Sequence, residues 1–285
     1  KNIGFRYITQ HPNGMKIFCL QEWEALALYK DVQGYFKNGI ELHEGDTVFD
    51  VGANIGLFTL QAYELGKKNV NIYAFEPIPA TYKVLYHNAQ RFGPEKIKAF
   101  DYGLSHTCKT MTFSYRPGVT MWSTSQDDDW KKAQKDDTSK NINRNIKNIV
   151  PNFHWLRWLP SFLRFWFIKR QVKDMVVKEE QVQCQVRTLS DIIREHNVQR
   201  IDLLKVDVEG SEHDVFLGIE EQDWPKIKQI VAEVHELNNR EKITPLLKTL
   251  LKKHGFGEIV IEQDDVFKES NIFSLYALRP KKSGV

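Results

Sequence analysis

Residues 46–59, D-T-V-F-D-V-G-A-N-I-G-L-F-T, constrain the fold more than any other stretch of the chain. The first part is a short apolar run that ends in a carboxylate at Asp50, as expected for a buried parallel strand. Gly52 and Gly56 then bracket a tight turn, and leucines follow at helical spacing. A strand, a glycine turn and a helix N-terminus form a ligand cradle, because the missing side chains let a ligand approach the backbone. The spacing D-x-G-x-x-x-G differs from the G-x-G-x-x-G of dinucleotide-binding folds.

A second acidic strand end follows at the distance expected for a strand-helix-strand unit. Residues 71–75 form an apolar run, and Glu76 comes 20 positions after Gly56. At the carboxyl edge of the sheet, this carboxylate can accept both hydroxyls of a ribose, although a solvated glutamate is the alternative. The pattern resembles the S-adenosylmethionine site of Rossmann-like methyltransferases, in which the turn after the third strand (here residues 96–101) reads the adenine. The predicted adenine contacts come from Asp101, Tyr102 and Gly103.

Two later strands also end in acidic residues. Residues 201–212 run from an apolar strand into D-V-E-G-S-E, and residues 229–236 end in E-V-H-E. We expect a neutral His235 to act as the general base, with Asp207 or Glu209 orienting it or the substrate. Alternatively, Asp207 and His235 both bind one divalent cation, which lowers the pKa of a hydroxyl group on the substrate. The remaining interpretation is a structural histidine whose ring nitrogen hydrogen-bonds to a carboxylate and takes no part in catalysis.

Composition places the chain among ordinary globular proteins. Of 285 residues, 41% are apolar and 27% charged, and a net charge of +3 is too small to argue for a nucleic-acid partner. The cysteines (Cys19, Cys108 and Cys184) match no metal or disulfide spacing, which favours a reducing, cytoplasmic location. We expect no signal peptide, and no apolar run approaches the ~20 residues of a membrane span. The start at Lys1 suits a domain excised from a larger multidomain protein.

The chain divides into a cap and one α/β domain. Residues 1–45 predict the cap, with Asn13-Gly14 marking a hairpin between two short strands. Residues 46–285 predict a mostly parallel sheet with helices on both faces and an antiparallel final strand pair.

Residues 116–180 predict a long helical insertion into this domain. Between Lys140 and Lys178, nine lysines or arginines stand against one acidic residue, and they are interleaved with tryptophan and phenylalanine. Helical spacing puts Arg157 and Arg164 on one face and the aromatic side chains on an adjacent face. We expect the aromatic face to act as a lid over the substrate pocket and the cationic face to dock an acidic partner protein, with simple core packing and contact with a membrane or nucleic acid as the alternatives.

The segments F-D-V-G-A-N-I-G (49–56), F-E-P (75–77), L-K-V-D-V-E-G-S-E (204–212) and E-V-H (233–235) together resemble the FkbM family of methyltransferases. The E-P-I-P run and the insertion look most like the FkbM domains embedded in polyketide and non-ribosomal peptide synthetases. The resemblance implies a Rossmann-like class I methyltransferase with S-adenosylmethionine as cofactor. It further implies O-methylation of a hydroxyl on an intermediate that phosphopantetheine tethers to an acyl or peptidyl carrier protein. The implied cofactor contacts are Asp50, Gly52, Asn54, Gly56, Glu76 and Pro77.

Three other functions stay open. The acceptor could be a free small molecule or a sugar. A nucleic-acid methyltransferase would use the basic aromatic insertion, but no Asn/Asp-Pro-Pro-Tyr motif is present, so we expect no nucleic-acid partner. A non-catalytic module would dock through residues 155–168. The intact cofactor motif argues against that module: Asp50, Gly52, Gly56 and Glu76.

Overall fold

A seven-stranded sheet forms the centre of the protein, which we describe from a computed structural model. The structure describes residues 7–10, 13–117, 119–120, 123–125, 160, 163, 179–236, 242–263 and 271–280. The strand order is β11-β12-β10-β9-β3-β4-β5, and β12 runs opposite to the other six strands of this sheet. This confirms the predicted α/β fold with an antiparallel final pair. The strands are β3 (Thr47–Val51), β4 (Asn71–Phe75), β5 (Ile97–Phe100), β9 (Ile201–Val206), β10 (Ile227–His235), β11 (Glu258–Glu262) and β12 (Ile272–Leu278).

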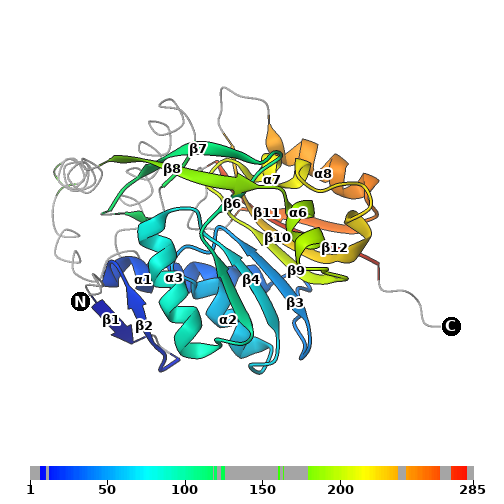
Figure 1. Cartoon of the computed structure of the whole chain (residues 1–285). Coiled ribbons are helices and arrows are strands. Elements are labelled where there is room, and N and C mark those ends of the chain that lie inside the picture. The colour runs from blue at the N-terminus through cyan, green and yellow to red at the C-terminus, as the bar shows by residue number, and fades with distance from the viewer. Residues whose placement is uncertain are drawn as a thin grey trace.

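Helices cover both faces of the sheet (Figure 1). One face carries α1 (Glu22–Val32), α2 (Leu57–Leu65) and α3 (Pro79–Phe92). The other carries α6 (Leu189–Glu195), α7 (Glu212–Leu217), the short η4 (Trp224–Lys226) and α8 (Ile243–Lys253).

The two faces build separate cores from alternate residues of the same strands. In β3, Val48 packs into one cluster and Phe49 into the other, and in β9 Leu203 and Leu204 divide in the same way. Because both faces are buried, the strands read as continuous apolar runs. This explains why the sequence predicts the central strands correctly.

The N-terminal segment packs against α2 and α3. The hairpin β1 (Tyr7–Gln10) and β2 (Lys16–Cys19) turns at the predicted Asn13-Gly14, and η1 (Gln33–Phe36) follows α1. The buried side chain of Asn88 in α3 joins this segment to the glycine turn. Its Oδ1 accepts from the Phe18 N–H at 2.9 Å, and its Nδ2 donates to the carbonyls of Phe18 at 3.1 Å and Ile55 at 2.9 Å.

A second, three-stranded sheet lies beside the central one (Figure 1). It consists of β6 (Gly103–Leu104), β8 (Glu180–Arg187) and β7 (Lys109–Tyr115), and the sequence did not predict β7. The predicted insertion, residues 116–180, connects β7 to β8. Its expected helices, with the lid and docking faces of residues 155–170, fall almost entirely outside the described residues. Within the described ranges, no helix is long and apolar enough to cross a membrane.

Candidate active site

The glycine turn between β3 and α2 is tight enough to require glycine. Gly52 has φ +80°, and a Cβ there would lie 1.7 Å from the carbonyl oxygen of Asp207. Gly56 has φ +92° at the start of α2, where a Cβ would lie 2.8 Å from Cδ1 of Leu85. The Gly52 N–H donates to the Phe75 carbonyl at 3.1 Å. The ends of β3, β4 and β9 thus converge at this turn, where glycine lets the backbone segments pack closely together.

Glu76 follows β4 directly and lies beside this turn, with 6% of its surface exposed. Its two carboxylate oxygens accept hydrogen bonds from the backbone N–H of Asn54 at 3.0 Å and of Ile78 at 2.9 Å. Burial raises the pKa of Glu76 to about 7, against the lowering effect of these two hydrogen bonds. The structure therefore brings the predicted Glu76 and Asn54 together at the edge of the cradle.

Asp50 lies beneath the turn. Its side chain is completely buried, accepts a hydrogen bond from the Thr59 hydroxyl and lies 3.2 Å from Nζ of Lys205. The same Nζ donates to the Gly52 carbonyl at 2.8 Å. Burial lowers the pKa of Lys205, but Asp50 and Asp207 outweigh burial and raise it. This charged pair holds the turn in place, and a direct cofactor contact from Asp50 stays a prediction.

The residues predicted to read the adenine follow β5 at the same edge of the sheet. Asp101 is exposed. The ring of Tyr102 lies 5.9 Å from that of Phe75. Gly103 starts β6, where a Cβ would lie 3.3 Å from Cγ of Pro77. The turn and Pro77 are thus neighbours, and their contact with an adenine stays a prediction.

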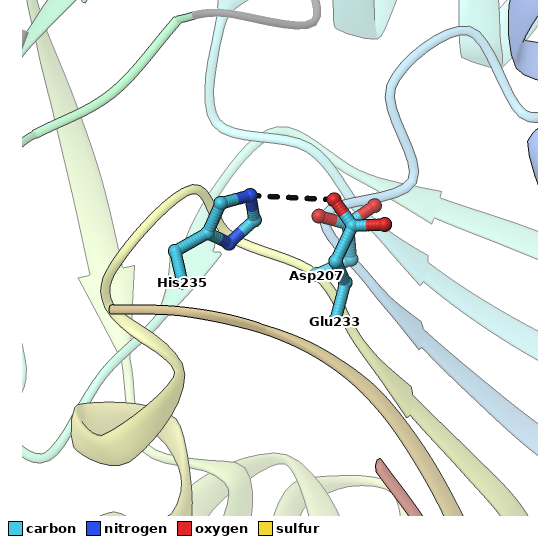
Figure 2. Close-up of side chains that lie close together, drawn as sticks. All are labelled: Asp207, Glu233 and His235. Carbon is cyan, nitrogen blue, oxygen red and sulfur yellow. Dashed lines mark ion pairs between the residues drawn. The ribbon is translucent and has the colours of Figure 1, made fainter. Parts of the chain in front are cut away.

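The ends of β9 and β10 bring together the three residues predicted to be catalytic: Asp207, Glu209 and His235. Nε2 of His235 lies 3.3 Å from Glu233 and 3.5 Å from Glu209. Figure 2 shows the imidazole facing the carboxylates of Asp207 and Glu233. On its other side, Nδ1 lies 3.0 Å from Oε1 of the fully buried Glu212.

This surrounding charge changes the expected state of the histidine. Burial lowers the pKa of His235, but the carboxylates of Glu209 and Glu212 outweigh burial and hold the pKa well above its ordinary value. Burial also raises the pKa of Glu209 well above its ordinary value. The neutral imidazole predicted from the sequence is therefore not the state that this environment favours. The assignment of His235 as general base stays a prediction.

Three site residues were missing from the predicted set. Glu233 lies two positions before His235, so strand periodicity places it on the same face and could have found it. Glu212 belongs to the quoted D-V-E-G-S-E block. Tyr35 of η1 donates its hydroxyl to Oδ2 of Asp207 at 2.9 Å, and no sequence signal connects the two.

Residues that follow β7 connect the two halves of the site. The Thr120 hydroxyl lies 3.5 Å from the side-chain amide of Asn54 in the glycine turn. The Thr124 hydroxyl donates to the backbone carbonyl of Glu209 at 2.7 Å, and the hydroxyls of Ser125 and Ser211 lie 3.1 Å apart. The start of the predicted insertion therefore lies against both the glycine turn and the acidic loop.

Comparison with known proteins decides the family. Residues 50–259 match the model of the methyltransferase FkbM domain, and this range includes the glycine turn and both acidic strand ends. The chain belongs to the FkbM methyltransferase family. It is thus a methyltransferase, and its fold implies S-adenosylmethionine as the methyl donor. The turn at Gly52 and Gly56, with the buried carboxylate of Glu76 beside it, fits such a donor.

Relatives of this FkbM-family chain include a methyltransferase and a synthetase by name. The chain is 31% identical to the 31-O-demethyl-FK506 methyltransferase FkbM of Streptomyces tacrolimicus, over 94% of this chain and 95% of that protein. It is 30% identical to the AMB antimetabolite synthetase AmbE of Pseudomonas aeruginosa, over 94% of this chain but only 12% of the synthetase. The crystal structure of a methyltransferase FkbM from Methylobacillus flagellatus KT has the same fold, with a TM-score of 0.50 at 15% identity, covering 85% of this chain and 46% of that one.

Proposed function

We propose that this FkbM-family protein is an O-methyltransferase that acts on a hydroxyl of a biosynthetic intermediate. The observation that supports it is the position of the carboxylate–histidine cluster beside the donor cradle. The backbone of Asp207 fills the space that a side chain on Gly52 would need, so the first residue of the cluster lies in direct contact with the glycine turn. An acceptor hydroxyl bound at Asp207, Glu209 and His235 would therefore lie next to the donor.

The chemistry requires removal of a proton, because a neutral hydroxyl is a weak nucleophile near pH 7. When bound, S-adenosylmethionine supplies an electrophilic methyl group, and its sulfur keeps the electron pair of the broken C–S bond. The acceptor oxygen provides the electron pair of the new C–O bond and gives its proton to the cluster. Asp207, Glu209 and His235 orient the acceptor, and a carboxylate of this cluster takes up the proton because the imidazole favours its protonated form.

The names of the relatives support an oxygen acceptor in a biosynthetic assembly. One relative is a 31-O-demethyl-FK506 methyltransferase by name, which supports a hydroxyl acceptor. The match to 12% of a much larger synthetase supports an acceptor that a carrier protein presents. We therefore propose an acyl or peptidyl carrier protein as partner. A free small molecule or sugar is the second class of acceptor, and the basic insertion makes RNA a third class to test.

Intact-mass analysis tests the acceptor. The protein is incubated with S-adenosylmethionine and a hydroxyacyl group, either tethered to a carrier protein or offered as its free pantetheine thioester. We expect a gain of one methyl mass on the tethered acceptor, with at least ~10-fold higher kcat/KM than on the free thioester. Equal kcat/KM would refute the carrier protein as partner. Methylation of RNA, or of nitrogen or carbon alone, would refute the O-methyltransferase proposal.

Two variants test the cluster. Glu209→Gln and His235→Asn should each lower kcat by ~10²-fold or more and leave the affinity for S-adenosylmethionine unchanged. Asp214→Asn is the matched control, because this side chain on α7 pairs with His106 outside the cluster. Full activity in both cluster variants would remove these residues from the mechanism.

A further inference from the structure

The three side chains in Figure 2 have the geometry of a cation site. Asp207, Glu233 and His235 each offer one ligand atom, and these atoms all lie within 4.8 Å of one another. Opposite ligands of an ion bound at ~2.1 Å lie ~4.2 Å apart, so small movements of these side chains would complete a coordination shell. We propose that Asp207, Glu233 and His235 bind one divalent cation of the Mg²⁺ or Mn²⁺ class.

The sheet register builds this triad. Residue 206 of β9 pairs with residue 232 of β10 in the parallel ladder, so Asp207 and Glu233 are the next residues on adjacent strands. His235 lies two positions beyond Glu233 on the same face of β10. Strand ends in a central sheet are rigid, which is what a metal site needs to hold its ligands in position.

Two of the ligands already have the outer partners that metal ligands use. A metal-bound histidine usually donates its second ring N–H to a carboxylate, which fixes the tautomer and turns the other nitrogen toward the ion. Glu212 lies 3.0 Å from Nδ1 of His235, so Nε2 points to the triad. The Tyr35 hydroxyl donates to Asp207 at 2.9 Å, and Nζ of Lys205 lies 3.5 Å from the same oxygen. These contacts hold both ligands toward one point.

Charge and access favour a cation at this point. The carboxylates of Asp207, Glu209 and Glu233 lie on one side of the imidazole in a half-buried site, where three carboxyl groups outnumber the Lys205 ammonium beside Asp207. Their side chains are 24%, 19% and 22% exposed, so an ion can enter from solvent. A divalent cation would balance this charge without any change in the fold.

The donor atoms select the class of ion. Two carboxylates and one imidazole suit Mn²⁺, which accepts both ligand types, and Mg²⁺, which prefers oxygen and keeps several waters. Three protein ligands leave coordination positions for water or for the acceptor oxygen. Where the proposed O-methylation holds, the ion would bind the acceptor hydroxyl and lower its pKa. Cation binding itself does not depend on that function.

Titration of Mn²⁺ into the metal-free protein tests the site, and electron paramagnetic resonance measures the free ion. We expect one bound Mn²⁺ per chain in the absence of donor and acceptor. Glu233→Gln should weaken binding at least ~10-fold, and Glu212→Gln, which removes the carboxylate that orients His235, by about 10- to 100-fold. Glu258→Gln is the matched control on the exposed face of β11 and should bind as the wild type does. Melting curves confirm that each variant is folded.

Each outcome decides the proposal. No Mn²⁺ binding at millimolar concentration, or equal binding by the wild type and a folded Glu233→Gln variant, would overturn the site. Either result leaves the proposed methyl transfer standing, since the assay contains neither donor nor acceptor. Conversely, tight Mn²⁺ binding by a protein that methylates no hydroxyl would keep the site and refute the function.

Discussion

The affinity for S-adenosylmethionine should depend on pH through Glu76. Burial raises the pKa of this carboxyl from its ordinary value of 4.5 to about 7. The hydroxyls of a ribose donate hydrogen bonds, so the proposed contact favours the ionised carboxylate and binding must release a proton wherever Glu76 holds one. At pH 6 about one-tenth of the carboxyl groups are ionised and at pH 8 about nine-tenths. Affinity should thus be about tenfold lower at pH 6, which corresponds to ~1.4 kcal/mol.

Calorimetry at pH 6, 7 and 8, in two buffers of different ionisation enthalpy, measures both the affinity and the proton release. The Glu76→Gln variant is the control, because the amide has a similar shape but does not titrate. It should bind ~2 kcal/mol more weakly than the wild type at pH 8 and show no dependence on pH. A wild-type affinity that is the same at pH 6 and pH 8, or a Gln variant with the same pH slope, would refute the assignment of Glu76 to the ribose.

Three further substitutions test the packing beneath the site. Gly52→Ala should lower the free energy of unfolding by at least ~1–3 kcal/mol because of its left-handed φ, and by more because the new Cβ meets the Asp207 carbonyl; the melting temperature should fall and donor binding should be lost. The control Gly14→Ala, at φ +85° with open space around it, should show only the backbone effect, and equal melting temperatures of the two variants would contradict this. Lys205→Met leaves Asp50 buried without its cation and should lower the free energy of unfolding, measured in urea, by ~3–5 kcal/mol. The control Lys98→Met, at an exposed lysine, should lower it by less than ~0.5 kcal/mol, and a small loss in both variants would show that the buried pair contributes little. Tyr35→Phe removes the hydroxyl that donates to Asp207 and should weaken Mn²⁺ binding about 10-fold, while the free energy of unfolding changes by ~1 kcal/mol or less. Unchanged Mn²⁺ binding would mean that Tyr35 does not orient Asp207.

The sequence predicts the parts of the fold that short segments determine. The strands β3, β4 and β9 are buried on both faces, so each is a compact apolar run that ends at a glycine or an acidic residue. Gly52, Gly56 and Glu76 lie where their spacing places them, because one strand-helix-strand unit fixes all three. In contrast, most residues of β7 are exposed or half-buried, and the strand pairs with β8 across the long predicted insertion, so no nearby segment indicates it.

The protonation state of the carboxylate–histidine cluster depends on contacts that the sequence does not display. His235 and Glu233 are close in the chain, but Glu212 reaches the imidazole from 23 residues away. Tyr35 reaches Asp207 across 172 residues, from a segment expected only to cap the domain. The pKa of His235 results from how these distant groups converge. For this reason the position of His235 at a strand end can be predicted from the sequence, but its charge cannot.

The single buried amide of Asn88 makes two distant parts of the chain open together. It satisfies the N–H and the carbonyl of Phe18 in the hairpin and the Ile55 carbonyl of the glycine turn. Separating either part would leave the buried Asn88 amide without these hydrogen bonds, which costs ~1–3 kcal/mol. We therefore expect the hairpin and the turn to unfold as one cooperative unit, so that hydrogen exchange at the Phe18 N–H follows the order of the glycine turn.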